Sequence, residues 1–147
     1  MDPNRRVLVI DDDANVRRIL SGALRNRSLH VDEAPDGSVA IALLAENRYA
    51  VVLLDLLMPN VDGFGVLDAI GDGANPPIVL VVSGADRRVL DQVDSRKIHG
   101  IVKKPFDPVE IADIVTACTE IRGRSALEAM AYATVIAGAP LIALLKL

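Results

Sequence analysis

Four consecutive apolar residues that end in an acid constrain the fold of this chain more than any other feature. They are Val51, Val52, Leu53 and Leu54, and Asp55 follows them directly. The run is too short for an ordinary helix and half of it is β-branched, so it predicts a strand buried on both faces of a parallel sheet. An acid after such a strand lies at the carboxyl edge of the sheet, where open α/β folds bind ligands. We therefore expect a functional site around Asp55.

Composition places the chain among globular proteins with one core. Its 147 residues are 51% apolar and 24% charged, and the net charge of −4 gives no electrostatic reason to bind nucleic acid directly. The single cysteine, Cys118, excludes an intramolecular disulfide and is expected in the core. His30 and His99 stand alone, so each is expected to be solvated or structural. Because the polar start has no signal-peptide core, we expect a cytoplasmic location.

Short apolar runs alternate with helical patterns along the chain. The expected strands are 7–10, 29–34, 51–54, 78–82 and 101–103. The expected helices are 16–27, 39–47, 63–70, 86–98 and 108–121. Such alternation predicts a parallel sheet with right-handed crossovers and helices on both faces. The fold class is therefore α/β: a doubly wound five-stranded parallel sheet, a flavodoxin-like (βα)5 three-layer sandwich.

Acids and other polar residues follow these strands in two different roles. Helix caps or turns account best for one group, which consists of Asp13, Asp36, Asp62 and Asp107. The second group follows the first, third, fourth and fifth strands, and we expect it to meet at one edge of the sheet: Asp11, Asp12, Asp55, Ser83 and Lys104.

Three carboxylates at short range repel one another unless a cation joins them. Mg²⁺ is the best candidate, because it prefers oxygen ligands. One carboxylate can then act as a nucleophile toward a phosphoryl donor, while the metal, Lys104 and Ser83 neutralise the phosphoryl oxygens. The pattern therefore predicts phosphoryl-transfer chemistry.

Four motifs make residues 7–121 resemble the receiver domain of bacterial two-component response regulators. In chain order the motifs are Val-Leu-Val-Ile-Asp-Asp-Asp, Leu-Leu-Asp-Leu-Leu-Met-Pro-Asn-Val-Asp-Gly, Val-Val-Ser-Gly and Lys-Lys-Pro-Phe. The resemblance implies a CheY-like phosphorelay module and not an enzyme in the ordinary sense. Phosphorylation would switch a protein-binding surface formed by helix 86–98, strand 101–103 and helix 108–121, which would bind an unidentified output protein.

The resemblance also implies a role for each residue at the sheet edge. Asp55 would accept a phosphoryl group from a histidine kinase or a phosphotransfer protein. Mg²⁺ would be held by Asp11, Asp12, Asp55 and the main-chain carbonyl of Leu57. Ser83 would contact the phosphoryl group and Lys104 would pair with it.

Further expectations come from the family pattern and from departures from it. The peptide bond between Lys104 and Pro105 would be cis. Ile101 stands where the family often has an aromatic side chain that turns inward on activation, so this readout is not expected here. Leu57 and Ala85, each two residues beyond a site residue, cannot hydrogen-bond an attacking water. We therefore predict a long-lived phosphoryl group.

Residues 123–147 form an apolar tail after a receiver domain that we assign to residues 1–122. Residues 129–145 are 17 residues without a charge, about 26 Å as a helix against a hydrocarbon core of about 30 Å, and Pro140 interrupts them. A membrane span is therefore not favoured. We expect a helix over residues 126–137, starting at a capping box of Ser125 and Glu128.

Such an apolar helix would pack against the receiver or against a second copy. We favour a homodimer through the tail or through the face of helix 86–98, strand 101–103 and helix 108–121. The tail is too short for a winged-helix output domain, so we expect a stand-alone or a truncated receiver.

Two other functions compete with the phosphoacceptor hypothesis. A phosphohydrolase of the haloacid-dehalogenase kind needs a second acid two residues after the nucleophile, where this chain has Leu57. A scaffold or dimerisation module that works without phosphorylation would keep the fold and leave the site unused. The complete acidic set and Lys104 argue against the scaffold.

Overall fold

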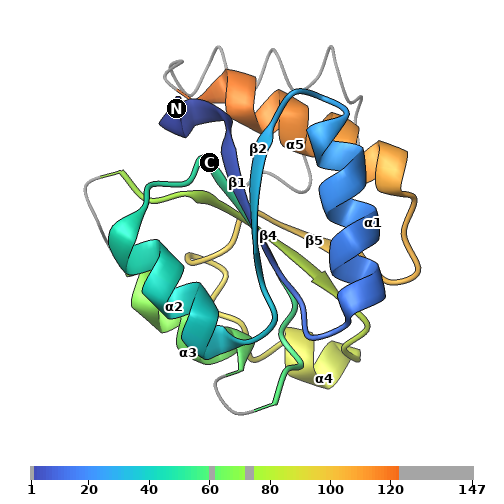
Figure 1. Ribbon diagram of the computed structural model, residues 1–147. Helices are drawn as coiled ribbons and strands as arrows, with labels where there is room; N and C mark the ends of the chain where they lie inside the picture. The colour runs from blue at the N-terminus through green and yellow to red at the C-terminus, as the bar shows by residue number, and fades with distance from the viewer. Residues whose placement is uncertain (1, 60–61, 72–74, 123–147) are drawn as a thin grey trace.

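The computed structural model describes residues 2–59, 62–71 and 75–122, and they form a five-stranded parallel sheet with helices on both faces (Figure 1). The strands are β1 (Arg6–Ile10), β2 (His30–Ala34), β3 (Val51–Leu54), β4 (Ile78–Ser83) and β5 (Gly100–Lys103). The 3₁₀ turn η1 (Pro3–Arg5) precedes the helices α1 (Ala14–Arg25), α2 (Gly37–Glu46), α3 (Gly63–Ile70), α4 (Arg87–Leu90) and α5 (Pro108–Ile121). The strand order β2-β1-β3-β4-β5 is the flavodoxin-like order, so the predicted fold class is confirmed.

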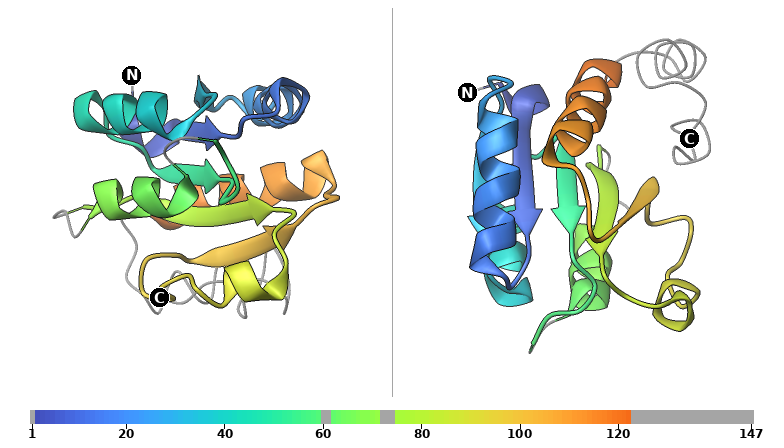
Figure 2. Two further views of the ribbon diagram at one scale, coloured as in Figure 1. Left: turned by 90° about the horizontal axis from the view of Figure 1, so that it is seen from below. Right: turned by 90° about the vertical axis from the view of Figure 1, so that its right-hand side faces the viewer.

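The central strand β3 is buried on both faces, as its four apolar residues predict. Val51 and Leu53 pack in the cluster beneath α1 and α5, whereas Val52 and Leu54 pack in the cluster beneath α2 and α3. All four residues of β3 are at most 1% exposed. The two views in Figure 2 show the sheet between these layers of helices. This double burial holds the end of β3, and with it Asp55, in a fixed place.

Aspartates begin the helices, as the sequence pattern predicts. Asp13, Asp36, Asp62 and Asp107 accept backbone N–H bonds in the first turns of α1, α2, α3 and α5. Asp86 does the same for α4. These side chains satisfy N–H groups that have no partner within the helix. The capping assignment is therefore confirmed for all four predicted residues.

The helix expected over residues 86–98 is much shorter in the structure, because α4 ends at Leu90. The segment that follows is bent by Asp94, whose carboxylate accepts the backbone N–H of Arg96 at 3.0 Å and whose carbonyl accepts that of Lys97 at 2.9 Å. A side chain that bonds the nearby backbone competes with helix formation. Val93 still packs on the second cluster, which explains the helical spacing in the sequence.

Several smaller expectations are also met. Cys118 is buried, and burial raises the pKa of its thiol to about 12. His30 is exposed, while His99 accepts the backbone N–H of Val79 through Nδ1 at 3.0 Å. The peptide bond before Pro105 is cis. Across the described ranges, no helix has the length and apolar character needed to cross a membrane. The stretch 129–145, to which the membrane expectation applied, and the predicted tail helix over 126–137 both lie outside the described residues, so these two expectations stay predictions.

Candidate functional site

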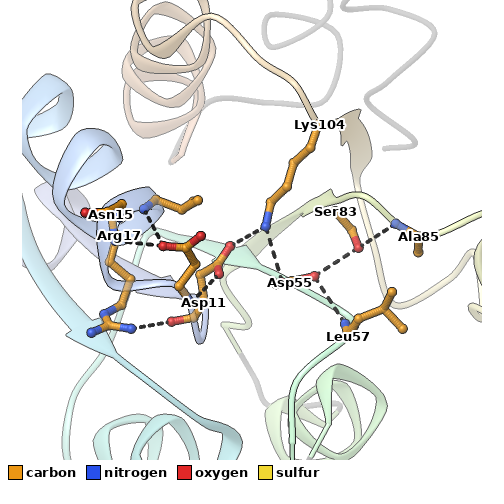
Figure 3. Close-up of polar contacts among 10 residues, drawn as sticks. Asp11, Asn15, Arg17, Asp55, Leu57, Ser83, Ala85 and Lys104 are labelled. Atoms are coloured by element: carbon orange, nitrogen blue, oxygen red, sulfur yellow. Dashed lines mark hydrogen bonds and ion pairs between the residues drawn. The ribbon is translucent and has the colours of Figure 1, made fainter.

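Asp55 lies at the carboxyl edge of the sheet, where the ends of β1, β3, β4 and β5 meet (Figure 3). Its backbone N–H donates to the carbonyl of Ile10 at 2.9 Å, which extends the pairing of β3 with β1 by one residue. The residue is only 5% exposed. The fold thus presents a nearly buried carboxylate at the edge where the sequence pattern places the site.

The Asp55 carboxylate is held by donors from three segments. Oδ1 accepts the hydroxyl of Ser83 at 2.9 Å and the backbone N–H of Leu57 at 3.1 Å. Oδ2 accepts Lys104 Nζ at 3.3 Å. The Ser83 hydroxyl in turn accepts the backbone N–H of Ala85 at 3.2 Å. Ser83 therefore connects the carboxylate to the loop that follows β4.

Lys104 contacts Asp11 more closely than it contacts Asp55. Its Nζ lies 2.7 Å from Asp11 Oδ2, and Asp11 Oδ1 accepts the backbone N–H of Asp13 at 2.9 Å. The sequence pattern predicts that Lys104 and Asp11 share a site, but not that they form its shortest ion pair. The single ammonium of Lys104 therefore bridges two nearly buried carboxylates.

The pKa shifts reflect the crowding of charges in this site. Burial raises the pKa of Asp11, the nearby Asp55 charge adds to the rise, and the hydrogen bonds from Lys104 and Asp13 only partly oppose it. For Lys104, burial acts to lower the pKa, but the hydrogen bond to Asp11 and the charges of Asp55 and Asp11 outweigh it, so its pKa is raised. The pocket is therefore short of positive charge.

The three acids offer a suitable ligand set for a divalent cation. One carboxylate oxygen each from Asp11, Asp12 and Asp55 lies within 4.8 Å of the others, and Asp12 is exposed to solvent. Hard oxygen ligands of this kind suit Mg²⁺, which keeps several waters when it binds to proteins. The described contact of Leu57 is through its N–H, so the role expected for its carbonyl stays a prediction.

Close packing against the backbone explains why residue 63, at the start of α3, is a glycine. A Cβ at this position would lie 2.6 Å from the carbonyl oxygen of Asp55 and 2.6 Å from Leu56 Cα. Both atoms belong to the backbone and cannot move aside easily. The start of α3 therefore packs directly against the backbone that carries Asp55, which the motif alone does not reveal.

Arg17 is a member of the site that the sequence analysis missed. Its Nη1 donates to the main-chain carbonyl of Asp11 at 2.7 Å (Figure 3). One signal was available: a cation in the first turn of a helix is disfavoured by the helix dipole and calls for a local reason. The predicted amphipathic pattern accounted for this arginine only as part of the polar face.

The fold and the acidic site together define a receiver-type signalling module. The chain belongs to the response regulator receiver domain family, whose model matches residues 7–116. The family consists of signalling modules rather than enzymes that turn over a substrate.

Similar proteins agree with this assignment. The transcriptional regulatory protein SrrA of Staphylococcus aureus is 33% identical over 109 residues, which cover 74% of this chain and 45% of SrrA. The chain thus spans less than half the length of this curated relative. A response regulator receiver domain from Bermanella marisrubri is 32% identical, with a TM-score of 0.69. The match covers 76% of this chain and 95% of the Bermanella chain.

A third similarity concerns the fold alone. The response regulator TrrA from Thermotoga maritima, solved in complex with Mg²⁺ and BeF, has a TM-score of 0.69 at 24% identity. The match covers 78% of this chain and 98% of TrrA.

Proposed function

We propose that this protein is a phosphoacceptor response regulator and that Asp55 receives a phosphoryl group from a histidine kinase or a phosphotransfer protein. The observation that carries the proposal is the buried Asp55 carboxylate, with Ser83 and Lys104 as donors and two further acids at hand. A scaffold has no need for this arrangement, because burying several like charges is costly.

Asp55 would attack the phosphorus atom with one carboxylate oxygen. An acyl phosphate bond would form, and the bond from phosphorus to the donor's imidazole nitrogen would break. Lys104 and Ser83 now bond the carboxylate, and both would be close enough to donate to the phosphoryl oxygens instead. Such donors stabilise charge on the transferring group.

Asp11, Asp12 and Asp55 would hold Mg²⁺ together with the carbonyl of Leu57. Bound there, the ion would neutralise phosphoryl charge and orient the donor. The pKa of Asp11 is raised by its burial and, to a lesser extent, by the charge of Asp55, and a cation bound beside both acids would offset these two effects.

The signal would leave the site through Ser83. Its hydroxyl accepts the N–H of Ala85, so a move toward the phosphoryl group would draw the loop after β4 with it. The surface of α4, β5 and α5 would change as a result and bind the output protein. Ile101 is partly buried in β5 and offers no hydroxyl-tipped ring for this change.

The first test is intact-mass spectrometry after incubation with acetyl phosphate, with and without Mg²⁺, on the parent and on Asp55→Asn. We expect the parent to gain one phosphoryl group only with Mg²⁺, and Asp55→Asn to gain none. Asp36→Asn, which changes the cap of α2 and leaves the residues of the acidic site unchanged, is a matched control and should be phosphorylated like the parent.

Other outcomes would point to a different function. If the parent gains no mass under any condition, the scaffold or dimerisation module becomes the better hypothesis. If Asp55→Asn is still phosphorylated, the acceptor is another residue. The cytoplasmic location and the homodimer stay predictions.

A further inference from the structure

We infer that Arg17 is a positioning residue that sets the geometry of the Asp11–Asp12 pair for a divalent cation. The inference rests on the proposed Mg²⁺ site. Arg17 would not touch the ion, because its guanidinium contacts the main-chain carbonyl of Asp11 at 2.7 Å. It would act on the site through the peptide unit that joins the two acids.

Asp12 depends on its backbone for its position. Within the described ranges, no hydrogen bond or ion pair holds its carboxylate, although one of its oxygens lies within 4.8 Å of oxygens from Asp11 and Asp55. Asp11 differs, because Lys104 and the N–H of Asp13 hold its side chain. The carboxylate of Asp12 can therefore be directed only by the preceding peptide unit and by its own side-chain torsions.

Arg17 fixes that peptide unit from one side of the sheet edge. The N–H of Asp11 donates to the carbonyl of Ala34 at 3.2 Å, and its carbonyl accepts Arg17 Nη1. Arg17 is itself held, because its side chain is 17% exposed and its Nε lies 3.8 Å from Glu33 Oε1. Because two nitrogens of its guanidinium are already held, Arg17 would lose little side-chain conformational freedom when Mg²⁺ binds.

Because Arg17 is charged, the inference can be tested by whether Arg17→Met weakens or strengthens Mg²⁺ binding. A guanidinium near the site repels a dication, so removing the charge alone would strengthen Mg²⁺ binding. Removing a group that orients the ligands would instead weaken Mg²⁺ binding. Loss of a contact that positions a metal ligand commonly costs about 10-fold to 100-fold in metal affinity. The two explanations therefore predict opposite results for Arg17→Met.

The chain offers a matched control in Arg25 at the other end of α1. Its Nη2 donates to the carbonyl of Val31 at 3.2 Å and lies 3.4 Å from Glu33 Oε2. Arg25→Met thus removes the same kind of contact, an arginine bonded to a carbonyl and to Glu33, far along α1 from the acids. It also removes one positive charge, as Arg17→Met does.

The experiment is calorimetric titration of the full chain with MgCl₂, applied to the parent, Arg17→Met, Arg17→Lys and Arg25→Met. We expect Arg17→Met to bind Mg²⁺ about tenfold more weakly. Arg17→Lys should recover part of the affinity, because an ammonium can still donate to the Asp11 carbonyl. Arg25→Met should stay within about twofold of the parent. Thermal melts in EDTA should show similar stability for the two Met variants.

Each other result overturns the inference. Equal affinities for Arg17→Met and Arg25→Met would mean that Arg17 supports α1 but not the cation site. Tighter binding by Arg17→Met would mean that its charge, and not its bond to Asp11, matters. If the parent binds no Mg²⁺ at all, the proposed metal site fails first and the inference fails with it.

Discussion

Asp55 accepts hydrogen bonds from two side chains that are distant in sequence, Ser83 at 28 residues and Lys104 at 49 residues. Each of these side chains follows or ends its own strand, so the parallel sheet alone brings them to one edge. We expect single residues beside this group to decide how long a phosphoryl group lasts. Leu57 is 52% exposed next to Asp55, while Ala85 is only 5% exposed.

Leu57→Asn should shorten the lifetime of the phosphoryl group. Leu57 is exposed beside the carboxylate, so an amide there can orient an attacking water without repacking the core, and a positioned polar group of this kind is worth at least about tenfold in rate. The measurement is the loss of phosphoryl mass over time at neutral pH. The double variant with Ala85→Glu should hydrolyse faster still. A parent that loses its phosphoryl group faster than the double variant would contradict the prediction.

Gly63→Ala should destabilise the protein by about 1–3 kcal/mol, because the added Cβ would overlap the backbone of Asp55 and Leu56. Gly22→Ala is the matched control. Beyond its chain neighbours and the backbone of α1, no atom of the described residues lies within 4 Å of a Cβ at Gly22, and alanine is the better helix former by about 1 kcal/mol. Urea unfolding should therefore shift the two variants in opposite directions. Equal shifts would mean that the contact at Gly63 carries no strain.

At the scale of elements, the β4–β5 pairing is extended by a histidine. The N–H of His99 donates to the carbonyl of Val79 at 2.8 Å, and the N–H of Val79 donates to His99 Nδ1 at 3.0 Å. Nδ1 can accept only while the imidazole is neutral. Burial, together with the nearby charge of Arg122, lowers the pKa of His99. The start of β5 is therefore sensitive to acid.

The stability of the protein should fall as the pH drops from 7 through the lowered pKa of His99. Because the folded-state pKa lies below the unfolded value of about 6.5, the contribution of neutral His99 is fully present above pH 6.5 and is lost below it. One proton changes stability by at most about 1.4 kcal/mol per pH unit. Urea unfolding at pH 7 and pH 5.5 should show a larger loss for the parent than for His99→Gln. Equal losses would exclude His99 as the cause.

At the scale of the whole molecule, α5 and the sheet are joined at the end opposite the acidic site. Arg122 follows α5 and donates to the carbonyl of Pro76 at 2.7 Å and to the side chain of Asn75 at 2.7 Å. These hydrogen bonds connect the segment before β4 to Arg122, the last described residue before the predicted tail. An apolar tail leaving from there has the receiver or a second copy available to cover it.

The full chain should be a dimer in solution, and residues 1–122 should be a monomer if the tail forms the contact. Light scattering coupled to size exclusion measures both. A dimer in both forms would instead favour the face of α4, β5 and α5. Monomers in both forms would refute the homodimer.

The strands, the helix caps and the fold class of this protein are determined by the sequence alone, because local patterns that repeat along the chain are enough to predict them. Short apolar runs predict strands that are buried on both faces, and an aspartate before a helical pattern predicts a cap. Alternation of the two element types then leaves essentially one architecture, which brings Asp11, Asp12, Asp55, Ser83 and Lys104 to one edge. The fold class and the meeting of these five residues at one edge could therefore be predicted.

Only the tertiary structure decided the contacts within that site. Lys104 bonds Asp11 across 93 residues at 2.7 Å, Arg17 holds the Asp11 carbonyl, and a Cβ at Gly63 would overlap the backbone of Asp55. The bend after α4 likewise depends on the Asp94 carboxylate, which accepts the backbone N–H of Arg96. Such distances follow from side-chain rotamers and packing between remote segments, and no periodicity along the chain encodes them.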